Sequence, residues 1–93
     1  MVGNRPLIKN DNRVALVMEQ FIRMCIHEGM DPNALDLLHC SNAQMEQLIS
    51  QKVFRMHQFT GSSKVAEHLM TVTQGKLKIE DAGFDWKILG PDV

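Results

Sequence analysis

Apolar residues recur at steps of three and four between positions 12 and 28, which is the spacing of one face of an α-helix. This stripe consists of Val14, Val17, Met18, Phe21, Met24 and Cys25. Leu16, Ile22 and Ile26 widen the apolar surface well beyond one face. Because a small domain covers one helix face with its own core, a second apolar face indicates another chain. We therefore predict a homodimer whose interface is formed by the six residues of the stripe.

Capping signals predict two more helices in the middle of the chain. Asp31-Pro32 is a typical pair of N-cap and first helical residue, and it precedes an apolar helix over residues 32–39. Ser41 and Gln44 have the spacing of a capping box, which predicts a third helix over residues 42–51. A short helix, a tight turn and a capped second helix are together typical of a helix-turn-helix corner.

The second half of the chain has a less regular pattern. Residues 53–59 alternate apolar and polar positions near their end, so a helix extension and a short strand both fit. A turn of glycine and serines then precedes a fourth helix over residues 64–74. We predict an all-α fold of four to five helices in a single domain over residues 1–93. Its parts are a flexible arm (1–11), a helical body (12–74) and an irregular tail (75–93).

The composition is that of a small globular protein. The chain has 93 residues, of which 44% are hydrophobic and 23% charged, and this balance argues against intrinsic disorder. Its longest uninterrupted apolar run, Val14 to Met18, is too short to cross a membrane. Two cysteines are too few for a disulfide framework, and no signal peptide is recognisable. These features predict reduced thiols and a cytoplasmic location.

Charge is unevenly distributed along the chain, although the net charge is only −1. Residues 50–78 contain five lysines and arginines against the single acidic residue Glu67, which gives this segment a net charge of +4. We predict that Lys52, Arg55 and Lys64 contact DNA phosphates. The alternative is a solvated basic surface with no binding role.

The third predicted helix carries weaker candidates for reading bases. Gln44 and Gln47 present side-chain amides, which suit the edge of adenine in the major groove. Glu46 lies on the same exposed surface, and its carboxylate would repel DNA phosphates. An ordinary helical corner without DNA contact is therefore the alternative interpretation.

Metal and catalytic motifs are not recognisable in the sequence. Its cysteines and histidines form no Cys-x-x-Cys or His-x-x-x-His pair, so we expect no metal site. No triad order, glycine-rich phosphate loop or paired-carboxylate motif is evident, so we expect neither a cofactor nor an enzyme.

Residues 37–59 carry a pattern that matches a known family. Leu38, Ser41, Gln44, Met45 and Leu48 recur at steps of three or less, and the segment Val53 to Phe59 follows them. This pattern resembles the D subunit of the flagellar master transcriptional regulator, the FlhD-like family, and the resemblance covers residues 12–70. It implies an all-α subunit that dimerises through its long first helix and binds promoter DNA with a C-type partner subunit. The chain is shorter than that family at its C-terminus, and no intersubunit disulfide is carried over.

The sequence thus predicts a bacterial transcriptional regulator subunit, an activator that dimerises and assists promoter DNA binding in a larger complex. The alternative is a protein–protein adaptor or inhibitor, such as a phage- or plasmid-encoded anti-activator, that does not contact DNA. No contact with a membrane is expected in either case.

Overall fold

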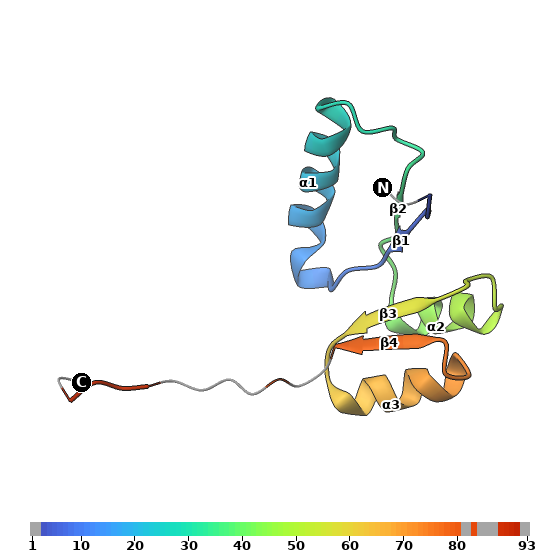
Figure 1. Cartoon of the computed structure of the whole chain (residues 1–93). Coiled ribbons are helices and arrows are strands. Elements are labelled where there is room, and N and C mark those ends of the chain that lie inside the picture. Colours follow the sequence, from blue (N-terminus) through green and yellow to red (C-terminus); the bar gives the residue numbers. More distant parts are fainter. Residues whose placement is uncertain (1–2, 81–82, 84–87, 92–93) are drawn as a thin grey trace. The chain divides into compact units, whose positions relative to one another are not determined.

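The computed structural model describes residues 3–80, 83 and 88–91. The chain divides into two compact units, residues 1–46 and residues 47–93. Each unit contains a pair of parallel strands, and the helix α2 (Asn42–Ser50) extends across the boundary between the two ranges. The order of the elements along the chain can be followed in Figure 1.

The first unit is a strand–helix–strand arrangement. Its elements are β1 (Leu7–Ile8), the 3-10 helix η1 (Asn12–Val14), α1 (Ala15–His27) and β2 (Asp36–Leu37). The two strands pair in parallel, with Leu7 opposite Asp36 and Ile8 opposite Leu37. A parallel pair requires a long crossover connection, and α1 provides it.

Local signals fix both ends of the first helix. The Asp11 carboxylate accepts a hydrogen bond of 2.8 Å from the backbone N–H of Arg13, which caps the start of η1. At the other end, Gly29 has a φ of 99°, and the N–H of Met30 donates to the carbonyl of Cys25. A positive φ after the last turn is the usual way for a helix to end. The helix predicted over residues 12–28 is confirmed as η1 followed by α1.

The helix predicted over residues 32–39 is wrong. The Asp31 carboxylate accepts a hydrogen bond from the N–H of Asn33, which forms a local turn and not the start of a helix. The chain then becomes extended, because the N–H of Asp36 donates to Pro6 and the N–H of Leu38 donates to Ile8. Without a helix on this side of the turn, the helix-turn-helix corner does not exist.

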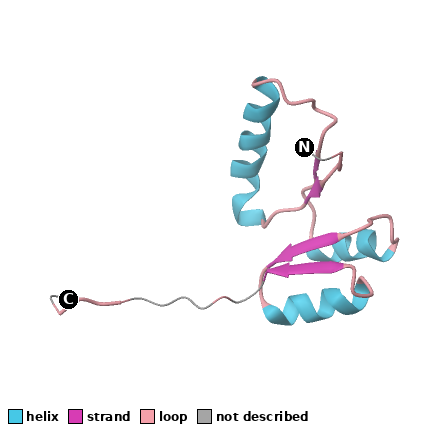
Figure 2. Ribbon diagram, in the orientation of Figure 1, coloured by secondary structure: helices cyan, strands magenta, loops and turns pink. Residues whose placement is uncertain are grey.

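The second unit repeats the strand–helix–strand order. Its elements are β3 (His57–Thr60), α3 (Ser63–Val72) and β4 (Leu77–Glu80), shown as strands and helices in Figure 2. The two strands are parallel, and their register runs from His57 opposite Leu77 to Thr60 opposite Glu80. Helix α3 connects them and packs against β4. Residues 57–60 thus follow the strand alternative of the sequence analysis.

The two shorter helices agree with the predicted ones. Helix α2 begins with the expected capping box, in which the N–H of Gln44 donates to the Ser41 hydroxyl and the N–H of Ser41 donates to the Gln44 side chain. Helix α3 begins after Ser62, which is the N-cap, and ends at Val72, two residues before the predicted end. Gly75 follows with a φ of 80°.

The prediction of an all-α fold is wrong, since the described residues form a mixed α/β structure with two small parallel sheets. Strand β1 lies in the predicted flexible arm, and β4 lies in the predicted irregular tail. Strands of two residues are too short to show any periodicity in sequence, and parallel strands often lack a clear alternation of apolar and polar positions. The tail positions 81, 82, 84–87, 92 and 93 lie outside the described residues.

Few side chains of the described residues are fully buried. Ile22 in α1, Ile49 in α2 and Ala66 in α3 are the buried apolar residues, and Thr73 is the buried polar one. Across the part of the chain that the structure covers, no helix has both the length and the apolar character to cross a bilayer.

Candidate functional site

The carboxyl ends of β3 and β4 meet at one edge of the second unit. The chain leaves β3 at Thr60, turns through Gly61 and Ser62, and enters α3 at Ser63. In parallel α/β structures, ligands bind at the carboxyl ends of the strands, where the loops lead into the helices. We call the segment Thr60 to Ser63 the strand–helix turn.

Gly61 allows the strand–helix turn to pass close to an aromatic ring. A Cβ atom at this position would lie 2.5 Å from Cζ and 3.0 Å from Cε1 of Phe59. The backbone of the turn is held in place from the other strand, because the N–H of Gly61 donates to the carbonyl of Glu80 at 3.1 Å. A glycine is therefore needed here for close approach and not for an unusual backbone angle.

The start of α3 offers hydrogen-bond donors to an anion. Ser62 is the N-cap, yet its side chain makes no capping hydrogen bond, and the first turn contains no acidic residue. The first N–H groups of an α-helix have no partner within the helix, and the helix dipole makes this end positive. Lys64 lies in the same turn and adds a full positive charge. This arrangement suits a phosphate group.

Glu80 brings a carboxylate to the same edge. It is the last residue of β4 and lies opposite Thr60 in the strand register. Its side chain is exposed, so that a bound molecule at this edge can reach it. An exposed carboxylate can accept a proton from a reacting group.

The amino end of the same strands differs in character. Burial, and to a lesser extent the charge of Lys76, lowers the pKa of His57 below its usual value. The His57 ring also makes an edge-on contact with Phe54, at 5.4 Å between ring centroids. His57 thus packs against Phe54 at the amino end of the strands and lies apart from the carboxyl edge.

The first unit has its own carboxyl edge, which is polar. Lys9 follows β1, and its Nζ donates to the side-chain oxygen of Asn42 at 2.9 Å, where α2 begins. Asn10 follows, and its Oδ1 is buried without a hydrogen-bond partner. The hydrogen bond from the Arg13 side chain, more than any other influence, lowers the pKa of Asp11 to about 2. These residues form a charged rim after β1.

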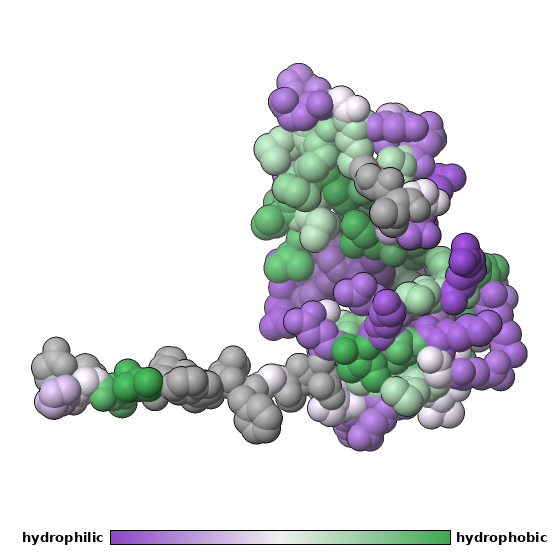
Figure 3. All heavy atoms as spheres, in the orientation of Figure 1, coloured by the Kyte–Doolittle hydropathy of each residue, from purple (hydrophilic) through white to green (hydrophobic). Residues whose placement is uncertain are grey.

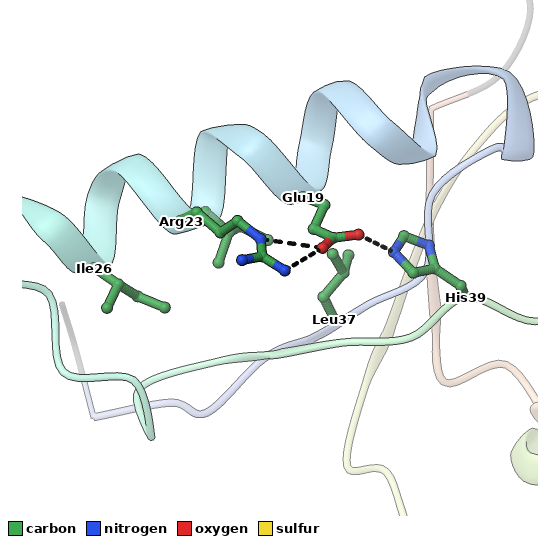
Figure 4. Close-up of a pocket in the computed structure, with 6 residues that line it drawn as sticks. Glu19, Arg23, Ile26, Leu37 and His39 are labelled. Carbon is green, nitrogen blue, oxygen red and sulfur yellow. Dashed lines mark hydrogen bonds and ion pairs between the residues drawn. The ribbon is translucent and has the colours of Figure 1, made fainter.

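A shallow, open pocket lies between α1 and the segment around β2 (Figure 4). Its apolar lining is Ile22, Ile26 and Leu37, and its volume is about 560 Å³. Glu19 lies between Arg23 and His39 at its mouth: the Arg23 Nη2 is 2.8 Å from Oε1, and the His39 Nε2 is 3.4 Å from Oε2. The hydrogen bond from Arg23 is the main cause that lowers the pKa of Glu19. The three polar side chains that line the pocket, Glu19, Arg23 and His39, are thus engaged in contacts with one another, and none of them is an obvious reactive group.

Metal ligands do not gather anywhere in the described part of the chain. Among those residues, no three His, Cys, Asp or Glu side chains lie close enough together to hold a metal ion.

The sequence profile of the aldehyde dehydrogenase family matches residues 1–83, which is most of the chain. The chain belongs to the aldehyde dehydrogenase family. It is 46% identical over 92 residues to a probable aldehyde dehydrogenase of Linum usitatissimum, a match that covers 99% of this chain and 17% of that protein. It is 44% identical, again over 92 residues, to the mitochondrial delta-1-pyrroline-5-carboxylate dehydrogenase 12A1 of Arabidopsis thaliana, covering 99% of this chain and 16% of that protein. The chain thus spans about a sixth of the length of these relatives.

Membership of the aldehyde dehydrogenase family overturns the functional predictions. The resemblance to the FlhD-like family is wrong, because the family match and both relatives concern dehydrogenases. The predicted transcriptional regulator, its C-type partner subunit and its DNA complex are wrong for the same reason, and so is the rival adaptor. The prediction that the protein is not an enzyme is also wrong, because both relatives are named as dehydrogenases.

The residues predicted to contact DNA lie on different elements of the chain. Gln44 is part of the capping box of α2, and Gln47 is exposed later in the same helix. Lys52 has a φ of 56° in the turn after α2, and Arg55 is exposed before β3. Lys64 alone lies in the first turn of α3, directly after the strand–helix turn. Nothing in the structure tests a contact of these residues with DNA.

The predicted dimer residues lie on α1 or just before it. Val14, Val17, Phe21 and Met24 are exposed, while Met18 and Cys25 are half-buried. The structure holds one chain, so the pairing of these side chains with a second copy stays a prediction.

Sequence reasoning missed Gly61 and Glu80. The sequence predicts residues 60–63 only as a turn that caps a helix, and the structure shows this turn with Ser62 as the N-cap. The available signal was a glycine directly after an alternating segment and directly before a helix, which is typical of a strand–turn–helix anion site. Glu80 had no signal of its own, because β4 was not predicted.

Proposed function

We propose that this chain forms part of the cofactor-binding and catalytic region of a dehydrogenase that oxidises an aldehyde. Two facts support the proposal: membership of the aldehyde dehydrogenase family, and a strand–helix turn with the features of a phosphate site. The observation that carries it is the parallel β3–α3–β4 arrangement, with Gly61 and Glu80 at one carboxyl edge.

The residues at this edge fit the pyrophosphate of a nicotinamide dinucleotide. Gly61 brings the backbone of the strand–helix turn close to the Phe59 ring, which no other residue at this position could do without a clash. Free N–H groups, the Ser62 hydroxyl and Lys64 are all donors, and an anion finds no acidic side chain in this turn. When bound, a nicotinamide dinucleotide accepts the hydride that leaves the substrate.

The role of the chain's own residues follows from this edge. The strand–helix turn binds and orients a phosphate group. The exposed Glu80 carboxylate would accept a proton from a hydroxyl of a hydrated aldehyde, whose hydride passes to the dinucleotide, or from a water that attacks the carbonyl carbon of the substrate. The names of the relatives suggest an aldehyde or pyrroline-5-carboxylate as the substrate.

Backbone NMR of the chain tests the phosphate site. Inorganic pyrophosphate and NAD⁺ are titrated separately, and the expected result is a saturable shift of the amides of Gly61, Ser62 and Ser63. The start of α2 is an internal control, because Ser41 and Gln44 already cap it. Gly61→Val, which places a bulky side chain in the turn, is expected to weaken both titrations several-fold. A folded chain whose strand–helix turn does not respond to either ligand would contradict the proposal.

A chimera tests the role of Glu80. The matching 92 residues of the Linum usitatissimum relative are replaced by this sequence. Glu80→Gln in this chimera is expected to abolish NAD⁺-dependent aldehyde oxidation while NAD⁺ binding persists, and Lys78→Gln on the same strand is the matched control. Unchanged oxidation in the Glu80→Gln chimera would exclude a catalytic role for the carboxylate.

The cytoplasmic location also stays a proposal. It is supported by the two cysteines, which are both free thiols. One of the two relatives is named as mitochondrial. Fractionation of cells that express a tagged form distinguishes the cytosol from mitochondria.

A further inference from the structure

Helix α1 carries a second apolar surface that faces away from its own unit. Val14, just before the helix, together with Val17, Phe21 and Met24 follows the three- and four-residue spacing of one helix face, and we call these four residues the outer stripe. Their exposed fractions are 47%, 70%, 54% and 55%. Figure 3 shows apolar colour gathered over this part of the first unit.

The outer stripe is distinct from the surface by which α1 packs on its own unit. That inner surface contains Ile22 and Ile26, which line the pocket together with Leu37 of β2. Ile22 is only 9% exposed. The outer stripe therefore remains accessible after α1 has made its contacts within the unit.

Such a surface is unfavourable in water. Adjacent large apolar side chains that stay exposed are typical of a surface that another polypeptide covers. A helix that is apolar on two faces is typically buried between two layers of protein. The first unit has little core of its own, because Ile22 is its sole buried apolar residue among those described.

Two observations indicate what covers the outer stripe. The second unit also exposes large apolar residues on several elements, including Met56, Val65 and Ile79. A larger body of the same polypeptide can cover exposed apolar surfaces on both units. The relatives contain such a body, since the matching segment is 17% or 16% of their length.

We propose that the outer stripe docks against an apolar face of the polypeptide that flanks the matching segment in a longer aldehyde dehydrogenase chain. The first and second units then fold on, and are stabilised by, the remaining part of the enzyme. This inference depends on the family membership and not on the proposed phosphate site or on Glu80.

The test compares the same substitutions in two settings. Val17→Lys and Phe21→Lys are made in the 93-residue chain, and in the chimera that carries this chain in the Linum usitatissimum relative. Gln20→Lys, on the polar side of α1, is the matched control. Soluble yield and thermal midpoint are measured for every variant, and molar mass is measured by light scattering for the 93-residue chain.

In the 93-residue chain, we expect all three substitutions to leave the thermal midpoint unchanged, because their side chains are already in water. In the chimera, we expect Val17→Lys and Phe21→Lys to lower the soluble yield several-fold, and Gln20→Lys to have no effect, because only the outer stripe becomes buried.

Three outcomes would overturn the proposal. The first is a chimera that tolerates Val17→Lys and Phe21→Lys as well as the control. The second is an insoluble unsubstituted chimera beside a soluble relative, since the outer stripe would then not fit the flanking polypeptide. The third is a stable dimer of the 93-residue chain that Val17→Lys converts to a monomer, which would identify a second copy as the occupant.

Discussion

Replacing Gly61 with alanine tests the close approach of the strand–helix turn to Phe59. The added Cβ would lie 2.5 Å from Cζ of the ring, a distance that real Cβ atoms do not adopt, so the ring must turn away. Phe59 is half-buried at the end of β3, and a displaced ring gives up its packing. The substitution therefore adds atoms where the structure has no room for them.

Two effects of opposite sign determine the magnitude. An alanine restricts the unfolded chain more than a glycine does, which stabilises the fold by about 0.4–1 kcal/mol where the backbone angle allows it. Gly61 has no positive φ, so this gain applies. Overpacking costs about 1–3 kcal/mol. We expect the overpacking to dominate, with a net loss of about 1–2 kcal/mol in the free energy of unfolding.

A double-mutant cycle in urea measures this competition. Phe59→Leu removes the ring atoms that the new Cβ would meet, so that Gly61→Ala should become neutral or slightly stabilising in its presence. The coupling between the two substitutions should be about 1–3 kcal/mol. If Gly61→Ala stabilises the wild-type chain, or if the two effects are additive, the ring does not restrict the turn and the reasoning is refuted.

Three other expectations can be checked on the same chain. Ile22→Ala should lower the free energy of unfolding by about 2–4 kcal/mol in urea titrations, because it leaves a cavity under α1, whereas Val17→Ala on the exposed side should change it by less than about 0.5 kcal/mol. The Asp11 carboxyl should titrate near pH 2 by NMR, and Arg13→Ala should return the titration midpoint toward the ordinary pKa of 3.8. The ionised carboxylate therefore stabilises the fold fully above pH 3.8, and this contribution is lost as the pH falls through about 2. His57 should titrate below 6.5, so the unfolded chain takes up the proton first and stability should decrease as the pH falls below 6.5; a midpoint at or above 6.5 would contradict its burial.

The sequence predicted those elements whose signals are local. The apolar spacing of residues 12–28 and the capping box of Ser41 and Gln44 act within a single helix, and both appear in the structure. The strand alternative for residues 53–59 was also available from alternation. These features depend on neighbours in sequence and not on the rest of the fold.

The errors arose where pairing between distant segments decides the structure. Asp36 and Leu37 are extended because the segment from Pro6 to Ile8 pairs with them. The sequence around residues 36 and 37 gives no indication of this distant segment. The apolar residues Val17, Phe21 and Met24 of α1 are exposed in the structure, and their cover by another chain stays a prediction. The resemblance at residues 37–59 to a family of transcriptional regulators is wrong because it depends on helix-capping residues that many folds share.

The parallel pairing in both units has a consequence for synthesis on the ribosome. An antiparallel hairpin can close as soon as its turn has been made, but β1 must wait until α1 and then Asp36 have been made. Likewise β3 stays unpaired until the chain reaches Leu77. Each nascent strand therefore keeps its backbone N–H and C=O groups unpaired for the time needed to translate a complete helix. If α1 or α3 forms early, it brings the second strand close to the first and so shortens the time that the two strands need to pair.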